Sequence, residues 1–173
     1  IYAITPQNEP LNAGNSMSML MYWDDCRDFI KQGLGPAFRE AGLDTKILIF
    51  DHNYNYDQME GQDGYPLKVY QDPAAAQYIA GSAWHNYGGR VSELDRIAAE
   101  APDKEIWFTE ASIGTWNYRF ERTLLWDFQD IFLGTLSRGG KGVVLWNLML
   151  DEKRGPYTNF KGSCMTCYGA VNI

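Results

Sequence analysis

The chain has 173 residues, enough for one domain, and 22 acidic against 15 basic residues give it a formal net charge of −7. A hydrophobic fraction of 45% excludes a disordered chain, and no apolar run approaches the roughly 18 residues of a membrane span. The negative net charge argues against a nucleic-acid partner, because proteins that bind nucleic acid usually present a basic patch. Aromatic residues make up 14% of the chain, which suits a surface that stacks on sugar rings as well as a core.

Short apolar runs and helical patterns alternate along the chain. Residues 1–5 form an apolar run that Pro6 stops, which is typical of a buried strand. Apolar spacing predicts a helix over 17–40, which Gly35-Pro36 should break or kink. The next elements are expected to be a strand at 46–50, a polar loop at 51–66, a helix at 72–79, a strand at 81–85, a helix at 92–101, a strand at 105–108, a helix at 120–137 and a strand at 142–146.

This order of elements predicts an α/β fold. Strands that alternate with helices form a parallel sheet, and apolar runs without two-fold alternation fit strands that are covered on both faces. Neither GxGxxG nor GxxxxGK[ST] occurs, so nucleotide-binding folds have no support. Residues 1–150 are expected to form the sheet and its helices, followed by loop and a short strand over 151–173.

Polar and aromatic residues follow all five expected strands. In a (β/α)8 barrel, such residues at the carboxyl ends of the strands meet at the active-site face. The five groups are Gln7-Asn8-Glu9-Pro10, Asp51-His52-Asn53, His85-Asn86-Tyr87, Thr109-Glu110-Ala111-Ser112 and Trp146-Asn147.

Glu9 and Glu110 stand out in these groups as a pair of carboxylates. Two carboxylates that face each other across the mouth of a barrel are the usual catalytic groups of glycoside hydrolases. Each could instead be a strand-end carboxylate in an ion pair.

The motifs around the two glutamates resemble those of glycoside hydrolase family 30, which includes glucosylceramidases and endo-β-1,6-glucanases. The resemblance runs over almost the whole chain. It rests on Thr5-Pro6-Gln7-Asn8-Glu9-Pro10 and Phe108-Thr109-Glu110-Ala111, supported by Arg27-Asp28-Phe29-Ile30, Asp72-Pro73-Ala74, Trp84-His85-Asn86-Tyr87 and Trp146-Asn147-Leu148. It implies a partial (β/α)8 TIM barrel made of strands 4–8 with their helices.

The resemblance also implies roles for individual residues. Glu9, at the end of strand 4, would be the general acid/base with the higher pKa, and Glu110, at the end of strand 7, the ionised nucleophile. Seven residues would bind the substrate. Asn8 would hydrogen-bond the sugar 2-hydroxyl, His85 and Tyr87 would lie beside the nucleophile, and Asp51 and Asn53 would lie at the edge of the pocket. At the end of strand 8, Trp146 would form an aromatic floor under the sugar, with Asn147 next to it. His85 could instead be a hydrogen-bonded structural residue, and Trp146 could instead be part of the core.

The function expected from the resemblance is retaining hydrolysis of β-linked glucosides or β-glucans through a covalent glycosyl-enzyme. The alternatives are a related retaining hydrolase such as a xylanase, and a catalytically silent carbohydrate-binding half-barrel. No cofactor and no metal are expected. The expected partners are the carbohydrate substrate, the remainder of the barrel and a β-sandwich domain toward which 151–173 would lead, with no nucleic acid and no membrane span.

Cys164-Met165-Thr166-Cys167 is a CxxC motif without a second pair of ligands, so a structural zinc site is disfavoured. A redox CxxC begins a helix, whereas this one lies in a glycine-flanked turn. We therefore expect a local disulfide between Cys164 and Cys167. Such a bond fits an oxidising compartment, and the protein is expected to be secreted, periplasmic or on the cell surface.

Overall fold

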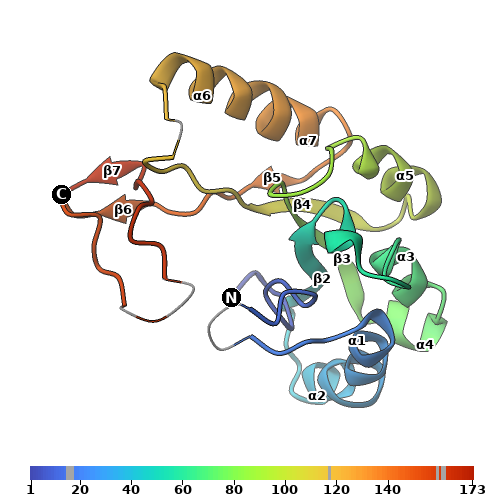
Figure 1. The fold of residues 1–173 in the computed structure, drawn as a ribbon. Coiled ribbons are helices and arrows are strands. Elements are labelled where there is room, and N and C mark those ends of the chain that lie inside the picture. The colour runs from blue at the N-terminus through green and yellow to red at the C-terminus, as the bar shows by residue number, and fades with distance from the viewer. Residues whose placement is uncertain (15–17, 117, 159, 161–162) are drawn as a thin grey trace.

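A computed structural model describes residues 1–14, 18–116, 118–158, 160 and 163–173 of the chain. Its main sheet has five parallel strands in the order β1-β2-β3-β4-β5, and it curls with its helices into part of a (β/α)8 barrel (Figure 1). The predicted fold class is therefore confirmed. The strands are β1 (Ala3–Ile4), β2 (Lys46–Asn53), β3 (Ile79–His85), β4 (Glu105–Glu110) and β5 (Gly142–Val143).

The first helix continues without a break through the glycine–proline pair that was expected to break or kink it. It consists of α1 (Trp23–Phe29), a π-helical segment (Ile30–Leu34) and α2 (Gly35–Glu40). The ring of a proline inside an α-helix collides with the carbonyl four residues earlier. The wider π turn just before Pro36 accommodates that ring. The helix begins later than predicted, since residues 18–22 are not helical, and Met17 lies outside the described residues.

Two helices lie where the sequence predicted a loop and one longer helix. The first, α3 (Tyr65–Tyr70), begins after Gly64 in the left-handed conformation and carries Pro66 in its first turn. The second, α4 (Pro73–Ala76), is capped by Asp72, whose carboxylate accepts from the amide of Ala74 at 2.9 Å. It is shorter than expected, because Ile79 already belongs to β3. A short 3-10 turn (Tyr56–Gln58) lies in the loop after β2.

The remaining helices match their predicted positions. Helix α5 (Glu93–Glu100) precedes β4, and one continuous helix consists of α6 (Phe120–Trp126), a π-helical segment (Asp127–Leu133) and α7 (Gly134–Leu136). Strand β5 is shorter than predicted, although Trp146 still bridges Ser112 after β4. The last strands, β6 (Met149–Leu150) and β7 (Val171–Asn172), pair with each other to one side of the main sheet (Figure 1).

An aromatic cluster packs beneath the carboxyl ends of the central strands. The ring of Phe50 lies 5.1 Å from that of Tyr65, 5.2 Å from Tyr56 and 5.0 Å from Trp84, and all four rings are buried. Close-packed rings of this size contribute strongly to a core. They hold the ends of β2 and β3 rigidly under the polar groups that follow. Among the described residues, every helix is too short or too polar to cross a bilayer.

Candidate active site

Residues at or after the carboxyl ends of β1, β3, β4 and β5 line one cleft of about 720 Å³. Both glutamates predicted to be catalytic line this cleft, and they reach it from the segment after β1 and from the end of β4. Other predicted residues at its wall are Asn8, Tyr87, Trp146, Cys164 and Cys167.

Glu9 is a buried carboxylate that is held from several sides. Its backbone amide donates to the carbonyl of Asp51 at 3.0 Å, and Asn12 donates to its Oε2 at 2.8 Å. Nδ1 of His85 lies 3.4 Å from its Oε1. Burial raises the pKa of Glu9, but the hydrogen bonds from His85 and Asn12 and the charges of His52 and His85 outweigh it, so the pKa lies below its ordinary value.

Asp51 lies beneath Glu9 and is also buried. It accepts hydrogen bonds from the hydroxyls of Thr5 and Thr109, both at 2.6 Å, and from Nε2 of His85 at 3.1 Å. Burial raises its pKa, and the hydrogen bond and charge of His85 lower it to a net depressed value. Burial alone would lower the pKa of His85, but its bonds to Asp51 and Glu9 raise it to about 9. A cationic imidazole therefore lies between two carboxylates.

A β-bulge in β2 arranges this cluster. Phe50 and Asp51 have positive φ angles of 78° and 53°, and the pairing of β2 with β3 shifts register between Phe50 and His52. Regular strands alternate their side chains between two faces, and a bulge re-aims them. Asp51 and His52 both reach the surroundings of Glu9 and His85 for this reason.

Glu110 faces the cleft at the end of β4. The hydroxyl of Tyr87 donates to its Oε1 at 3.0 Å, and the hydroxyl of Ser112 donates in turn to that of Tyr87 at 2.7 Å. Burial raises the pKa of Glu110, and the negative charges of Glu9 and Asp51 raise it further. The charge of His85 and the hydrogen bond from Tyr87 lower this pKa. The raising effects are larger, so the pKa of Glu110 lies above its ordinary value. The expectation that Glu9 has the higher pKa is therefore wrong for this structure, because His85 and Asn12 hydrogen-bond to Glu9 and not to Glu110.

Four predicted substrate-binding residues do not line the cleft: Asp51 and His85, which belong to the buried network around Glu9, and Asn53 and Asn147. Asn53 donates to Asp57 at 2.8 Å and accepts from the backbone amide of Tyr87 at 3.0 Å, so it braces the loop instead of edging the pocket. Asn147 borders two smaller cavities beside Trp146, one with Tyr168 and one with Pro156. Their positions next to strand ends indicated the right region but not the direction of the side chains.

The sequence reasoning did not assign several residues of this site. Asn12 contacts Glu9 from the turn after the motif, and no spacing rule connects the two. His52 was expected in a polar loop, whereas it lies within β2 and is fully buried. Trp116 lines the cleft from the loop after β4. An aromatic residue a few positions beyond the strand-end glutamate was the available signal.

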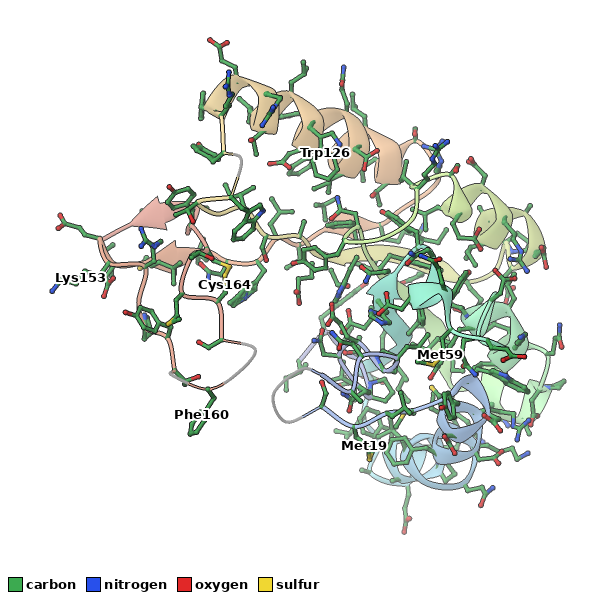
Figure 2. The ribbon with its side chains drawn as sticks, viewed as in Figure 1. Met19, Met59, Trp126, Lys153, Phe160 and Cys164 are labelled. Carbon is green, nitrogen blue, oxygen red and sulfur yellow. A yellow bond between two sulfur atoms is a disulfide. The ribbon has the colours of Figure 1, made fainter. Side chains whose placement is uncertain are left out.

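The structure contains a disulfide between Cys164 and Cys167, drawn in Figure 2 as a yellow bond beside the cleft. The segment that carries it is joined to the loop after β4. Gly114 forms a bridge with Cys167, and the amide of Thr115 donates to the carbonyl of Thr166 at 2.9 Å. The disulfide therefore fixes one wall of the site.

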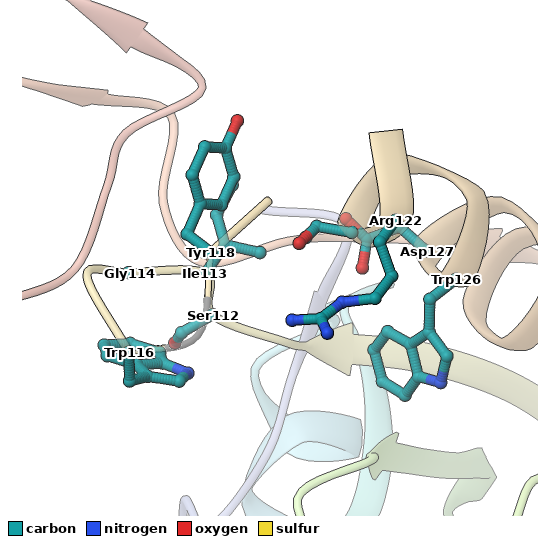
Figure 3. Close-up of a pocket in the computed structure, with 9 residues that line it drawn as sticks. Ser112, Ile113, Gly114, Trp116, Tyr118, Arg122, Trp126 and Asp127 are labelled. Atoms are coloured by element: carbon teal, nitrogen blue, oxygen red, sulfur yellow. The ribbon is translucent and has the colours of Figure 1, made fainter. Parts of the chain in front are cut away.

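A second cavity of about 420 Å³ adjoins the cleft, between the loop after β4 and helix α6 (Figure 3). It shares Ser112 and Trp116 with the cleft, and its wall also includes Tyr118, Arg122, Trp126 and Asp127. Burial raises the pKa of Asp127. Aromatic faces together with an acid and a base form a surface that suits a ring bearing hydroxyl groups.

A partial barrel with two glutamates at its strand ends is an arrangement found in glycoside hydrolases, and the sequence comparison identifies the family. Residues 1–170 match the TIM-barrel domain of glycosyl hydrolase family 30, and the chain belongs to that family. The resemblance predicted from the motifs is thus confirmed.

The chain is similar to curated members with two kinds of activity. It is 36% identical to an endo-1,6-beta-D-glucanase of Neurospora crassa, over all of this chain and 34% of that protein. It is 28% identical to the lysosomal acid glucosylceramidase of Mus musculus, over 90% of this chain and 32% of that protein. The chain thus spans about a third of the length of these relatives.

The solved structures agree with this grouping. The endo-beta1,6-glucanase BT3312 is 56% identical to the chain with a TM-score of 0.95, over 100% of this chain and 38% of that one. SrfJ from Salmonella typhimurium is 26% identical with a TM-score of 0.83, over 99% and 37%. A GH30 endoxylanase from Clostridium papyrosolvens, at 15% identity and a TM-score of 0.60 over 84% and 34%, shares the fold.

Proposed function

We propose that this chain carries the two catalytic carboxylates of a retaining hydrolase of β-linked glucosides, with β-1,6-glucan as the first candidate substrate. The observation that carries the proposal is the presence of Glu9 and Glu110 in one cleft, on strand ends that parallel pairing brings together. The choice of substrate follows the endo-beta1,6-glucanase at 56% identity, which is far more similar to the chain than the endoxylanase is.

In the proposed mechanism, Glu110 attacks the anomeric carbon and forms a glycosyl-enzyme while Glu9 gives a proton to the leaving oxygen. Glu9 then takes a proton from the water that releases the sugar. The hydroxyl of Tyr87, 3.0 Å from Glu110, orients the nucleophile. The expected separation of the two carboxyl groups is roughly 5–5.5 Å, because no water has to fit between a nucleophile and its target.

The roles of Glu9 and Glu110 are assigned from the sequence motifs and not from which of the two has the higher pKa. They are tested with substrates whose leaving groups differ in their need for a proton. In the proposed mechanism, Glu110→Gln abolishes turnover of every substrate. Glu9→Gln keeps the first step with an aryl β-glucoside whose phenolate leaves without a proton, but loses hydrolysis of β-1,6-glucan. The opposite pattern would exchange the two roles, and full activity of Glu110→Gln would remove the mechanism.

The test of the whole proposal is hydrolysis of β-1,6-glucan, glucosylceramide and xylan side by side, with the anomer of the first product followed by NMR. Cleavage of β-1,6-glucan with retained configuration supports the proposal. Preferential cleavage of xylan or glucosylceramide would make that compound the assigned substrate in place of β-1,6-glucan. Binding of glucan without any cleavage would support a catalytically silent carbohydrate-binding half-barrel. The assay is done on the 173-residue chain and on a longer form that supplies the rest of a barrel.

Three further predictions belong to this proposal. The division at residue 150, the docking of the chain against the rest of a barrel and a β-sandwich, and an extracytoplasmic location stay predictions. The disulfide at Cys164 and Cys167 supports the location, since such bonds persist in oxidising compartments.

A further inference from the structure

Two histidines direct ring nitrogens at the same carboxylate oxygen. Nδ1 of His85 lies 3.4 Å and Nδ1 of His52 lies 3.9 Å from Oε1 of Glu9. One ligand atom from each of the three residues falls within 4.8 Å of the others. Zinc bonds of about 2.0–2.1 Å to nitrogen and oxygen place tetrahedral ligands about 3.3 Å apart, so small adjustments suffice to enclose an ion.

The second nitrogen of each histidine faces a carboxylate. Nε2 of His85 bonds to Asp51 at 3.1 Å, and Nε2 of His52 lies 3.1 Å from Oδ2 of Asp57. Metal-binding histidines usually have this arrangement, in which an outer carboxylate fixes the ring and increases the basicity of the coordinating nitrogen. Here both histidines have it, and the β-bulge described above creates it.

His52 is the independent sign of a ligand. Its side chain is 0% exposed, and although Nε2 faces Asp57, Nδ1 makes no hydrogen bond within the described part of the chain. An unsatisfied buried polar group destabilises a folded protein. Its Nδ1 is directed toward Glu9, where a cation would satisfy it.

We propose that Glu9, His52 and His85 form a binding site for a divalent transition metal such as Zn²⁺, which displaces the proton from Nδ1 of His85 and has its open coordination position toward the cleft. Two imidazoles and one carboxylate favour a borderline metal over Ca²⁺ or Mg²⁺, which prefer oxygen ligands. The cleft provides the route of entry, because Glu9 lines it.

The consequence is reversible inhibition, which rests on the proposed role of Glu9. A metal bound to Oε1 occupies the carboxylate that would serve the leaving oxygen. Micromolar Zn²⁺ therefore lowers kcat, and a chelator restores it. Ca²⁺ and Mg²⁺ have no effect at the same concentration.

The test measures binding without substrate, so its outcome is independent of hydrolysis. Zn²⁺ is titrated by calorimetry, and Co²⁺ is followed by the visible absorption of a tetrahedral nitrogen–oxygen complex. One equivalent should bind to the parent chain. His52→Ala and Glu9→Gln should remove the site, and Asp57→Asn should weaken it about 10–100-fold through the orientation of His52.

Two variants serve as matched controls. Asp44→Asn changes an exposed aspartate outside the cluster, and Cys26→Ser removes the free, buried cysteine. Both should bind Zn²⁺ like the parent. Circular dichroism checks that each variant is folded. Unchanged binding in His52→Ala, or no binding to the parent, overturns the metal site and leaves the proposed hydrolase untouched. Binding without inhibition retains the site and counts against the role of Glu9.

Discussion

The carboxylate of Asp51 connects its own strand to three others. Its partners are Thr5 after β1, His85 at the end of β3 and Thr109 in β4, while Asp51 itself belongs to β2. A buried carboxylate is stable only when its hydrogen-bonding capacity is satisfied. The network therefore belongs to the architecture of the barrel as much as to its chemistry, since it fixes His85 under Glu9.

Asp51→Asn should destabilise the fold by about 3–5 kcal/mol, the typical cost of removing one partner from a buried charged pair. An amide has nearly the same volume, but its NH₂ group faces donors that need an acceptor. Thermal and urea unfolding at fixed protein concentration measure the change. Asp44→Asn, at an exposed position, should stay within about 0.5 kcal/mol of the parent. Equal stability of the two variants would mean that the network contributes nothing to folding.

Tyr87→Phe should lower kcat and change KM little. The ring stays in place, while Glu110 loses the only side-chain hydroxyl that donates to it among the described residues. A hydrogen bond to a charged group contributes about 1.5–3 kcal/mol, so kcat should fall roughly 10–100-fold. Kinetics with an aryl β-glucoside measure this. A rise in KM at constant kcat would instead assign Tyr87 to substrate binding.

At the scale of elements, the sequence predicted most of the fold because the strands are apolar runs and the long helices have clear periodicity. It failed where local geometry departs from the ideal. A π-helical segment carries the chain past Pro36, and no rule based on proline alone anticipates that. The site was predicted in outline from residues at strand ends. The bulge at Phe50–His52, which buries His52 and directs it at Glu9, depends on backbone angles that no periodicity reveals.

The junction between the loop after β4 and the disulfide segment depends on Gly114. An added Cβ would collide with the ring of Trp116 and the carbonyl of Thr166. Gly114→Ala should cost about 1–3 kcal/mol through overpacking. It should also speed reduction of the disulfide by dithiothreitol, since Cys167 is buried against this loop. Thermal unfolding and thiol labelling measure the two effects.

The matched control is Gly33→Ala, where a Cβ meets only ordinary contacts with Phe29. Replacing a helical glycine with alanine should leave the stability unchanged or raise it by up to about 1 kcal/mol. The disulfide should react at the parent rate in this variant. If Gly114→Ala behaves in the same way, the packing of Trp116 against that loop does not fix the wall of the cleft.

At the scale of the whole molecule, the curled sheet has two edges, β1 and β5. Unpaired backbone groups at a sheet edge offer a template for another chain. The helix from α6 to α7, which lies along one side of the arc in Figure 1, adds apolar side chains that are exposed to solvent. They are Phe120, Leu124, Leu125, Trp126, Phe128, Leu133 and Leu136. Contiguous apolar patches of this kind mark association surfaces.

The 173-residue chain should therefore associate as its concentration rises, with the helix from α6 to α7 as a contact. Sedimentation velocity between low and high micromolar concentrations measures the mass. Leu125→Glu combined with Leu133→Glu should shift association to higher concentration, because both side chains, 58% and 60% exposed, would become charged. Leu43→Glu changes a side chain that is 51% exposed but lies after α2, outside this helix, and it should associate like the parent. A monomer at every concentration would show that the exposed helix and the sheet edges do not cause association. Equal association of all variants would assign the contact to the sheet edges alone.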